Sequence, residues 1–567
     1  MTGQSKDSFD APGAACGPNA AHDASLGRRL IGGRSVRWDP PQAQAAYAAG
    51  SWVRETLADA LARAASDTPD RILVVEGGQR LDCRALHAQA RRLAQAMLAR
   101  APVGSVVSFM LPNWIEAATI YMAATLAGMI AHPLLPSLRD RDLAFMLADC
   151  DSRMIFAPAR FRGHDHVAML TRVAAGLANP PAVIVLRGDA GPHTAYERLF
   201  DDDQGPACQP PALEADAVRM VMYTSGTTGA PKGVMHSHNS IHALLRQIGR
   251  EWRVEPGDTF FVPSPISHIG GSIYAFEAPL LLGARAVLVE RWDPDEAVRI
   301  IDAEGCTHTA GATPFLEGLL DAARRAGSRL PSLKVFICGG ASVPPSLVRS
   351  GAEYFERAAV SRVYGSTEAP VTTVGVMDRR DIDHAAETDG RPGIAHVRLL
   401  DGGGADVSEG EIHVKGPQML RGYLHPDDEA TAFDAQGYYR TGDIGRWIDG
   451  DHLVVCSRAK DIIIRNGENI SPKEIEDVLI DHEDIAEVTV VGLPDPRTGE
   501  RACAVIVPKS KPGPDLDSLR AFLRAQGVAT FKIPEQLAIW DGLPKTDTGK
   551  VLKHLVRAEL TRPSRET

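Results

Sequence analysis

The sequence predicts an α/β protein: a large multi-layer N-terminal domain with β-sheets flanked by helices, followed by a small mobile α+β C-terminal domain. The chain has 567 residues, which is too long for a single hydrophobic core of ordinary size and indicates a large domain with at least one smaller one. From residue 56 to about residue 211, amphipathic segments such as 85–98 alternate with apolar strand-like segments such as 106–111. This alternation favours parallel strands with helical connections.

The boundaries follow from changes in this pattern. Residues 1–33 are rich in Ala, Gly, Asp and Ser, so we expect a disordered tail. We assign residues 34–456 to the large domain and residues 457–567 to the small one. In the small domain, Ser471, Pro472 and Glu474 make a capping box with proline at the first helical position. Further elements are expected there as strands at 488–491, 503–507 and 537–540 and helices at 475–480, 516–523 and 551–560.

Composition narrows the class of protein. The net charge of −11 argues against nucleic acid as a partner, because phosphate backbones need a basic surface. The eight cysteines are scattered without a CxxC pair, which suits a reducing cytoplasm and gives no zinc or disulfide framework. The longest uncharged segment, 117–131, is too short to span a bilayer and predicts a buried helix, so no integral membrane segment is expected. The sequence does not indicate the oligomeric state.

The most informative stretch is residues 223–233, YTSGTTGAPKG. An apolar run at 217–223, interrupted by Arg219, predicts a buried strand that opens into this loop, with a helix expected from Asn239 or Ser240. Glycines let the backbone approach a phosphate, and hydroxyls add donors. A P-loop is excluded because Lys232 is followed by glycine. We predict a polyphosphate cradle, with a flexible surface loop as the simpler alternative; its residues are Thr224, Ser225, Gly226, Thr227, Thr228, Gly229 and Lys232.

Two motifs after strand-like runs suggest a nucleotide and metal site. Gly339 and Gly340 follow the apolar run 333–337, at the strand edge where α/β proteins bind ligands. In VYGSTEA, residues 363–369, Tyr364 offers a flat face for a base, Thr367 a hydroxyl for an α-phosphate and Glu368 a hard oxygen ligand for Mg²⁺. Three neighbours are added as nucleotide-binding candidates: Ala341, Gly365 and Ser366.

The motifs nearer the C-terminus are weaker evidence for a function when each is considered alone. In YRTGDIGR, residues 439–446, Asp443 could accept both ribose hydroxyls, although aspartate here is also a common turn former. Arg458 could donate to the same ribose. Lys550 follows a Thr-Gly turn, where a lysine is usually just solvated.

The stretch PSPISHIGGS, residues 263–272, is less definite. His268 is either a hydrogen-bonded core histidine or a pocket residue, and Gly270 and Gly271 leave open volume beside it. No acidic residue is present to pair with a substrate ammonium.

Taken in order, these motifs resemble those of the adenylate-forming superfamily, which includes acyl-CoA synthetases, amino-acid adenylation domains and luciferases. The resemblance runs from Tyr223 to Lys553 and more loosely back to Trp38. Its finer likeness is to short- and medium-chain or cyclohexanecarboxylate-CoA ligases. It implies that residues 225–229 fold over the ATP phosphates, that His268, Gly270 and Gly271 border the acyl pocket, that Lys460 is the interdomain hinge, and that Lys550 reaches the active site.

The function expected from this resemblance is activation of a carboxylic acid by ATP and Mg²⁺ to an acyl-adenylate, followed by transfer to coenzyme A. Amino-acid-activating members carry an aspartate in the segment that contains His268, so an acid without an amino group is expected. Two alternatives remain open. One is an enzyme that loads a carrier protein in trans, and the other is a non-catalytic nucleotide or acyl-adenylate sensor.

Overall fold

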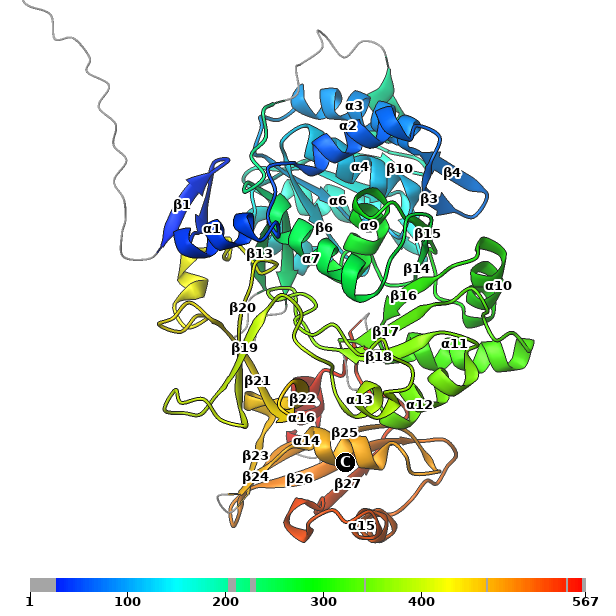
Figure 1. The fold of residues 1–567 in the computed structure, drawn as a ribbon, viewed down its shortest axis with the longest axis vertical. Helices are drawn as coiled ribbons and strands as arrows, with labels where there is room; N and C mark the ends of the chain where they lie inside the picture. The colour runs from blue at the N-terminus through cyan, green and yellow to red at the C-terminus, as the bar shows by residue number, and fades with distance from the viewer. Residues whose placement is uncertain are drawn as a thin grey trace, which may run out of the picture.

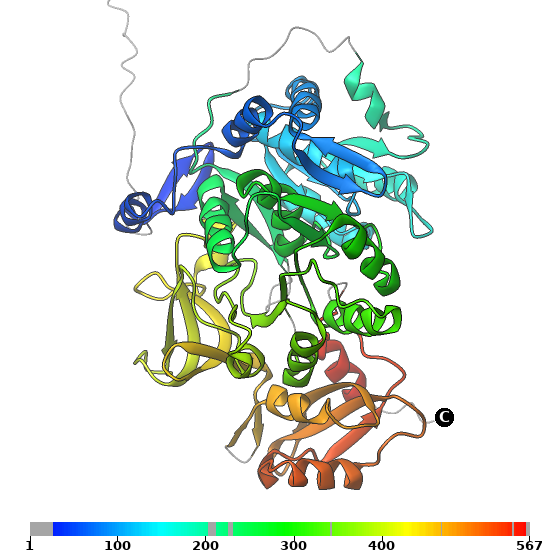
Figure 2. The same cartoon turned by 45° about the vertical axis from the view of Figure 1, so that its right-hand side comes forward.

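The computed structural model describes residues 27–201, 211–224, 231–340, 343–465, 468–546 and 549–562. Figure 1 shows a large part, coloured blue to yellow, above a small orange-to-red domain. The predicted α/β class with a smaller C-terminal domain is confirmed. Figure 2, turned by 45°, shows the small domain packed below the green segments and beside the yellow ones.

Two seven-stranded sheets form the large domain. Both are mainly parallel, as the alternating pattern predicted, with antiparallel strands at one edge of each. In spatial order the first sheet consists of β11 (Thr194–Ala195), β10 (Ala182–Leu186), β7 (Ser152–Pro158), β5 (Val106–Phe109), β6 (Ile130–Pro133), β12 (Val218–Thr224) and β13 (Lys232–Ser237). The second consists of β18 (Ala359–Val363), β17 (Val335–Gly339), β16 (His308–Gly311), β14 (Thr259–Val262), β15 (Arg285–Leu288), β3 (Ile72–Glu76) and β4 (Gln79–Asp82).

Smaller sheets complete the chain. An antiparallel four-stranded sheet, yellow in Figure 1, consists of β19 (His396–Leu400), β20 (Glu409–Lys415), β21 (Tyr439–Ile448) and β22 (His452–Arg458). The small domain has a five-stranded sheet with β24 (Glu468–Ile470), β23 (Ile463–Arg465), β26 (Gly499–Pro508), β25 (Ile485–Asp495) and β27 (Gln536–Ile539). Two hairpins lie apart: β1 (Arg28–Ile31) with β2 (Arg34–Arg37), and β8 (Arg160–Phe161) with β9 (His164–Asp165).

Several helices begin at capping side chains. Thr56 makes a reciprocal capping box with Asp59. At Ser471 only half of the predicted capping box forms: the Ser471 side chain accepts the Glu474 backbone N–H, while the Glu474 carboxylate pairs with Lys532. The helices are α1 (Pro40–Ala48), α2 (Leu57–Asp67), α3 (Cys83–Leu98), α4 (Ile115–Leu126), α5 (Asp140–Asp149), α6 (His166–Ala175), α7 (His238–Glu251), α8 (Ile269–Ser272), α9 (Ala278–Leu281), α10 (Pro294–Glu304), α11 (Thr313–Ala326), α12 (Pro345–Tyr354), α13 (Ile382–Glu387), α14 (Pro472–Leu479), α15 (Leu516–Ala525) and α16 (Lys553–Thr561). Short 3₁₀ segments are η1 (Tyr196–Phe200), η3 (Pro426–Glu429), η4 (Ala459–Asp461) and η5 (Thr530–Lys532), and η2 (Ile273–Glu277) is a π-helix.

One continuous core joins the two large sheets. It includes the fully buried side chains of Phe109, Tyr121, Trp252 and Phe260. Burying each such side chain stabilises the fold by about 1.5–3 kcal/mol. Helix α4 is buried along residues 117–126, which confirms the predicted buried helix. That prediction ran too far, because the chain turns at Gly128 and enters β6 instead.

The predicted disordered tail is partly wrong. Residues 1–26 lie outside the described residues, but 27–33 belong to the β1–β2 hairpin, dark blue in Figure 1. Arg28 and Arg37 of this hairpin form ion pairs with Glu429 at 2.6 and 3.1 Å. The partner is about 400 positions away in the chain, so this anchor is tertiary and has no local sequence signal. In the described segments, no helix is both long and apolar enough to cross a membrane.

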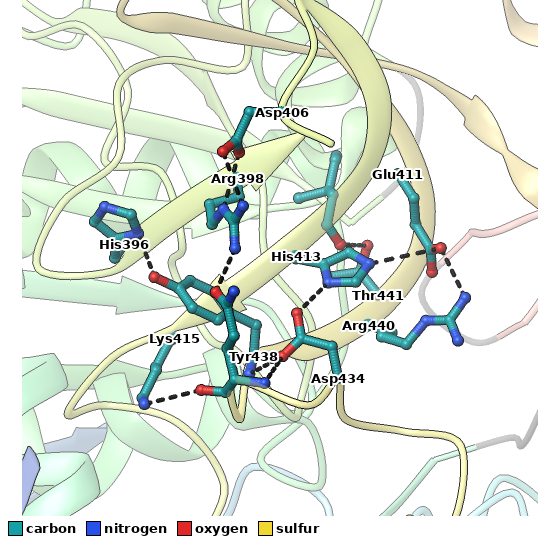
Figure 3. A network of polar contacts seen from close by, with 12 residues as sticks. His396, Arg398, Asp406, Glu411, His413, Lys415, Asp434, Tyr438, Arg440 and Thr441 are labelled. Carbon is teal, nitrogen blue, oxygen red and sulfur yellow. Dashed lines mark hydrogen bonds and ion pairs between the residues drawn. The ribbon is translucent and has the colours of Figure 1, made fainter. Parts of the chain in front are cut away.

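A polar network on the four-stranded sheet fixes the strand that carries Asp443 (Figure 3). The buried His413 of β20 lies between Asp434, with Nδ1 2.8 Å from Oδ2, and Glu411, with Nε2 3.6 Å from Oε2. Glu411 also pairs with Arg440 of β21 at 3.0 Å. Burial opposes the charge on His413, but hydrogen bonds to the two carboxylates raise its pKa above the usual value.

His413 should therefore stabilise the fold in a pH-dependent way. A raised folded-state pKa contributes stability that is complete below the unfolded pKa, about 6.5, and is lost as pH rises through the folded pKa. We expect His413→Gln to lower the free energy of unfolding by about 1–3 kcal/mol at pH 5.5 and by less at pH 9. Guanidinium denaturation at both values measures this. The control is His396→Gln on the neighbouring strand, and an equal loss for His413→Gln at both values would contradict the assignment.

Candidate active site

The predicted ribose site is a compact corner between the two domains. The Tyr364 hydroxyl donates to Asp443 Oδ2 at 2.7 Å, and Arg458 Nε lies 3.0 Å from Asp443 Oδ1. Asp443 and Arg458 face each other across β21 and β22. Burial and then the Asp443 charge hold the pKa of Tyr364 well above its usual range, so Tyr364 stays a donor. The structure thus brings together three residues that lie far apart in the sequence.

The neighbouring strand ends supply a flat wall. Gly339 ends β17 and is paired in register with Val363, the last residue of β18, so the Gly339 backbone and Tyr364 lie at one carboxyl edge of the sheet. A Cβ at Gly339 would lie 2.7 Å from the Val363 carbonyl oxygen, while Gly340 has φ +83° and open space beside it. Gly365 lies against the Val371 backbone. Ala341 lies outside the described residues.

A second corner surrounds Glu368. Thr224 Oγ1, at the end of β12, lies 3.4 Å from Glu368 Oε1, and the Tyr423 hydroxyl donates to the same oxygen at 3.1 Å. Both bonds engage Oε1, and the Tyr439 hydroxyl also hydrogen-bonds the Glu368 carboxylate. A buried carboxylate held in one orientation by hydroxyl groups fits a hard divalent cation such as Mg²⁺.

His236 on β13 positions the neighbouring Thr367. Its Nε2 lies 2.7 Å from the Thr367 carbonyl, which can only accept, so Nε2 carries the proton and Nδ1 faces the Ser240 hydroxyl at 3.1 Å. Burial lowers the pKa of His236 to about 4 and keeps it neutral. Ser366 turns the chain here, its hydroxyl accepting the Ala369 N–H. His236 was not predicted from the sequence, although it begins HSHNS, residues 236–240, shortly after the cradle.

The segment that follows the cradle differs from the prediction in one respect. Ser225, Gly226, Thr227, Thr228 and Gly229 lie outside the described residues, but their flanks are clear. The chain does not pass directly into a helix: Lys232 starts β13, which runs antiparallel to β12 before α7 begins at His238. The cradle therefore closes a β-hairpin. Lys232 Nζ lies 3.4 Å from Asp428 and 5.4 Å from the Tyr423 ring centroid.

The small domain places Lys550 beside the ribose corner. Lys550 follows a tight turn in which the Gly549 N–H bonds to the Thr546 carbonyl, and a Cβ at Gly549 would lie 3.2 Å from Pro314 of the large domain. Lys550 keeps an exposed surface, yet partial desolvation at the domain boundary lowers its pKa to about 8, with the positive charges of Arg458 and Lys460 adding to the shift. Asp443 acts in the opposite direction.

Lys460 lies in η4, directly after Arg458 ends β22 and before β23 starts the small-domain sheet. This is the single-chain connection predicted as the hinge. Ser346 of α12 donates to Asp481 across the domain boundary at 2.8 Å.

The predicted acyl segment forms a helix in which Gly270 and Gly271 have different surroundings. His268 precedes α8, which continues as the π-helix η2. A Cβ at Gly270 would meet only the Tyr274 ring, at 3.9 Å, so this glycine does leave space. The expectation that Gly271 leaves open volume is wrong, because a Cβ there would overlap the Pro265 carbonyl oxygen. Gly271 allows close backbone packing.

A second group of possible metal ligands lies away from this cleft. Asp381, His384 and His452 have ligand atoms within 4.8 Å of one another. However, His384 has a carboxylate on each nitrogen, Asp381 at 2.8 Å and Asp449 at 3.0 Å, and its ring stacks nearly parallel on His452. Stacked rings direct their lone pairs along parallel planes, so we interpret this cluster as an ionic link.

Comparison with known proteins agrees with this geometry. The profile of the AMP-binding enzyme family matches residues 61–424, and that of the AMP-binding enzyme C-terminal domain matches residues 474–550. The chain belongs to the AMP-binding enzyme family. It is therefore an adenylate-forming enzyme, and the resemblance seen in its motifs is confirmed.

Relatives of this adenylate-forming enzyme differ in their named products. The chain is 33% identical to the medium-chain fatty-acid–CoA ligase of Escherichia coli K12, covering 92% of this chain and 93% of the relative. It is 29% identical to the 2,3-dihydroxybenzoate–AMP ligase of Bacillus subtilis 168, covering 92% and 97%. ATP-bound MatB from Rhodopseudomonas palustris has a TM-score of 0.78 at 25% identity, covering 89% and 99%; apo MatB has 0.69 at 26%, covering 89% and 99%.

The two glycines of the acyl segment should respond differently to the same substitution. Gly271→Ala forces a shift of the backbone or its neighbours, so we expect a loss of about 1–3 kcal/mol in stability, measured by thermal unfolding. Gly270→Ala should unfold like the parent but lose activity toward the bulkiest acids it accepts, by about 1–3 kcal/mol in discrimination. The reverse pattern would show that the two environments are wrongly assigned.

Proposed function

We propose that this chain activates a carboxylic acid that lacks an amino group and transfers the acyl group to coenzyme A, releasing AMP and pyrophosphate. The observation that carries the proposal is the position of Lys550, on the small-domain tip, beside Asp443 and Arg458. A cation on the small domain thus lies close enough to Asp443 of the large domain, and to Arg458 at the domain boundary, for their charges to act on it. The higher TM-score with ATP-bound than with apo MatB is in keeping with this arrangement.

In the first half-reaction, an oxygen of the acid's carboxylate forms a bond to the α-phosphorus of ATP, and the bond from that phosphorus to the bridging oxygen breaks, so pyrophosphate leaves. The carboxylate needs no general base. The protein's task is to position both reactants and to disperse negative charge. Asp443 and Arg458 would hold the ribose, Tyr364 with Gly339 and Gly340 the adenine, and Lys550 with Thr367 the α-phosphate.

A divalent cation would be held by the Glu368 carboxylate, with the Thr224 hydroxyl nearby. Bound Mg²⁺ neutralises phosphate charge. In the second half-reaction the thiol of CoA loses its proton to solvent, the thiolate sulfur attacks the acyl carbon, the bond to the AMP oxygen breaks, and AMP leaves. The pantetheine chain needs the space beside Lys550, so we propose that the small domain turns about Lys460 between the two steps.

The acceptor separates this proposal from carrier-protein loading. Purified enzyme would be given ATP, Mg²⁺ and a panel of linear, branched, alicyclic and aromatic acids, with either CoA or a phosphopantetheinyl carrier protein. We expect acid-dependent AMP release that requires CoA. Release only with the carrier would overturn the CoA assignment, and no acid-dependent ATP–pyrophosphate exchange with any acid would favour a non-catalytic sensor.

The charge on Lys550 should set the alkaline limit of the first step only. Because its pKa is lowered to about 8, the ammonium is present below pH 8 and is lost above it. We expect kcat/KM for ATP in pyrophosphate release to fall above pH 8.

Lys550→Arg tests this because arginine stays charged; its profile should be flat to pH 9.5. Lys550→Ala should slow adenylation by at least 10²-fold while still converting supplied acyl-adenylate and CoA to thioester. Equal loss of both half-reactions in a folded Lys550→Ala protein would refute the two-orientation scheme.

A further inference from the structure

Two buried tyrosines converge on the Glu368 carboxylate. The Tyr423 hydroxyl donates to Glu368 Oε1 at 3.1 Å, and the Tyr439 hydroxyl lies 3.4 Å from that of Tyr423. Tyr423 is 3% exposed and Tyr439 is 8% exposed, so neither is a surface contact. These residues come from a loop after β20 and from the start of β21, respectively.

The direction of this hydrogen bond is fixed. An ionised carboxylate only accepts, so Tyr423 must donate. Thr224 approaches the same oxygen at 3.4 Å. One side of the carboxylate is thereby occupied, and the plane of the group is oriented.

The backbone of Tyr423 is itself anchored to the cradle hairpin. Tyr423 bridges to Val234, the Leu424 N–H bonds to the Gly233 carbonyl at 2.7 Å, and the Met235 N–H bonds to the Gly422 carbonyl at 3.0 Å. The loop thus lies along β13 as an additional short strand. A shift of the cradle hairpin would therefore also shift the backbone of Tyr423.

A second anchor comes from the N-terminal hairpin. The Tyr423 backbone N–H donates to Glu429 Oε1 at 2.9 Å. Glu429 is held by Arg28 at 2.6 Å and Arg37 at 3.1 Å. Arg28, Arg37 and Glu429 all lie outside residues 61–424, the range matched by the AMP-binding enzyme profile.

We propose that Tyr423 is a positioning residue that orients Glu368 toward the divalent cation, and that the β1–β2 hairpin supports it through Glu429. This rests on the proposed function, which assigns Glu368 as the metal ligand. Residues that hydrogen-bond a metal ligand commonly contribute 10–100-fold to metal affinity. Tyr423 does so by donating to Oε1, which fixes the orientation of the carboxylate that faces the cation.

Tyr423→Phe removes one hydroxyl and keeps the ring. Binding of Mn²⁺ to the full-length enzyme with a non-hydrolysable ATP analogue would be followed by electron paramagnetic resonance. We expect an affinity at least tenfold weaker, and a rate of pyrophosphate release that recovers at high Mg²⁺. The matched control is Tyr438→Phe, a half-buried tyrosine whose hydroxyl contacts His396 and not Glu368. Unchanged Mn²⁺ affinity in Tyr423→Phe, or an equal loss in Tyr438→Phe, would overturn the proposal.

Two further variants separate this inference from the function on which it rests. Glu368→Gln should lose Mn²⁺ binding more severely than Tyr423→Phe; if it does not, the metal assignment itself is wrong. Loss in Glu368→Gln without loss in Tyr423→Phe would leave the enzyme mechanism standing and remove the positioning role. Arg28→Gln should weaken Mn²⁺ binding about two- to fivefold in the same direction, and an unchanged value would remove the hairpin from the scheme.

Discussion

The buried carboxylate of Asp443 is the point on which the proposed site depends. An ionised carboxylate that leaves water without partners is strongly unfavourable, so its surroundings must supply donors in fixed positions. Here the donors are Tyr364, at the end of one large sheet, and Arg458, at the end of the four-stranded sheet. Lys550 approaches the same group from the small domain. The corner therefore exists only when three parts of the chain are correctly packed.

The rest of the site shows the same use of hydrogen-bonded supports behind reactive groups. His236 is neutral and holds the Thr367 carbonyl, while Tyr423 and Thr224 share one oxygen of Glu368. These supports come from the cradle hairpin and the loop that lies along it. A charge-dispersing site works best when its groups need no reorganisation during the reaction. The buried polar contacts around Glu368 supply that rigidity, while the segment that contains Lys460 is the covalent connection to the small-domain sheet.

Much of the fold could be predicted because its signals are local. The apolar run 217–223 became β12, the amphipathic stretch 85–98 became α3, and Ser471 begins α14 through its capping side chain. The motif order also indicated which residues would meet at Asp443. What could not be predicted depends on distant partners.

The composition of residues 27–33 predicted part of a disordered tail, and the residue that anchors their hairpin, Glu429, is distant in the sequence. Likewise, Gly270 and Gly271 are indistinguishable in sequence, and only the Pro265 carbonyl tells them apart. Tyr423 carries no local signal, since its role comes from β13 and Glu368. The strand β13 was not predicted, because it has only six residues, begins within the cradle motif at Lys232, and mixes polar with apolar side chains.

The most direct test of this account is the affinity of the protein for a non-hydrolysable ATP analogue, measured by calorimetry for the parent and for Asp443→Asn. The substitution keeps the size of the side chain but removes the charge that pairs with Arg458 and accepts from a ribose diol. The account predicts binding at least tenfold weaker with an unchanged adenine requirement and a folded protein. Equal affinities in the two proteins would contradict the assignment of Asp443 as the centre of the nucleotide site.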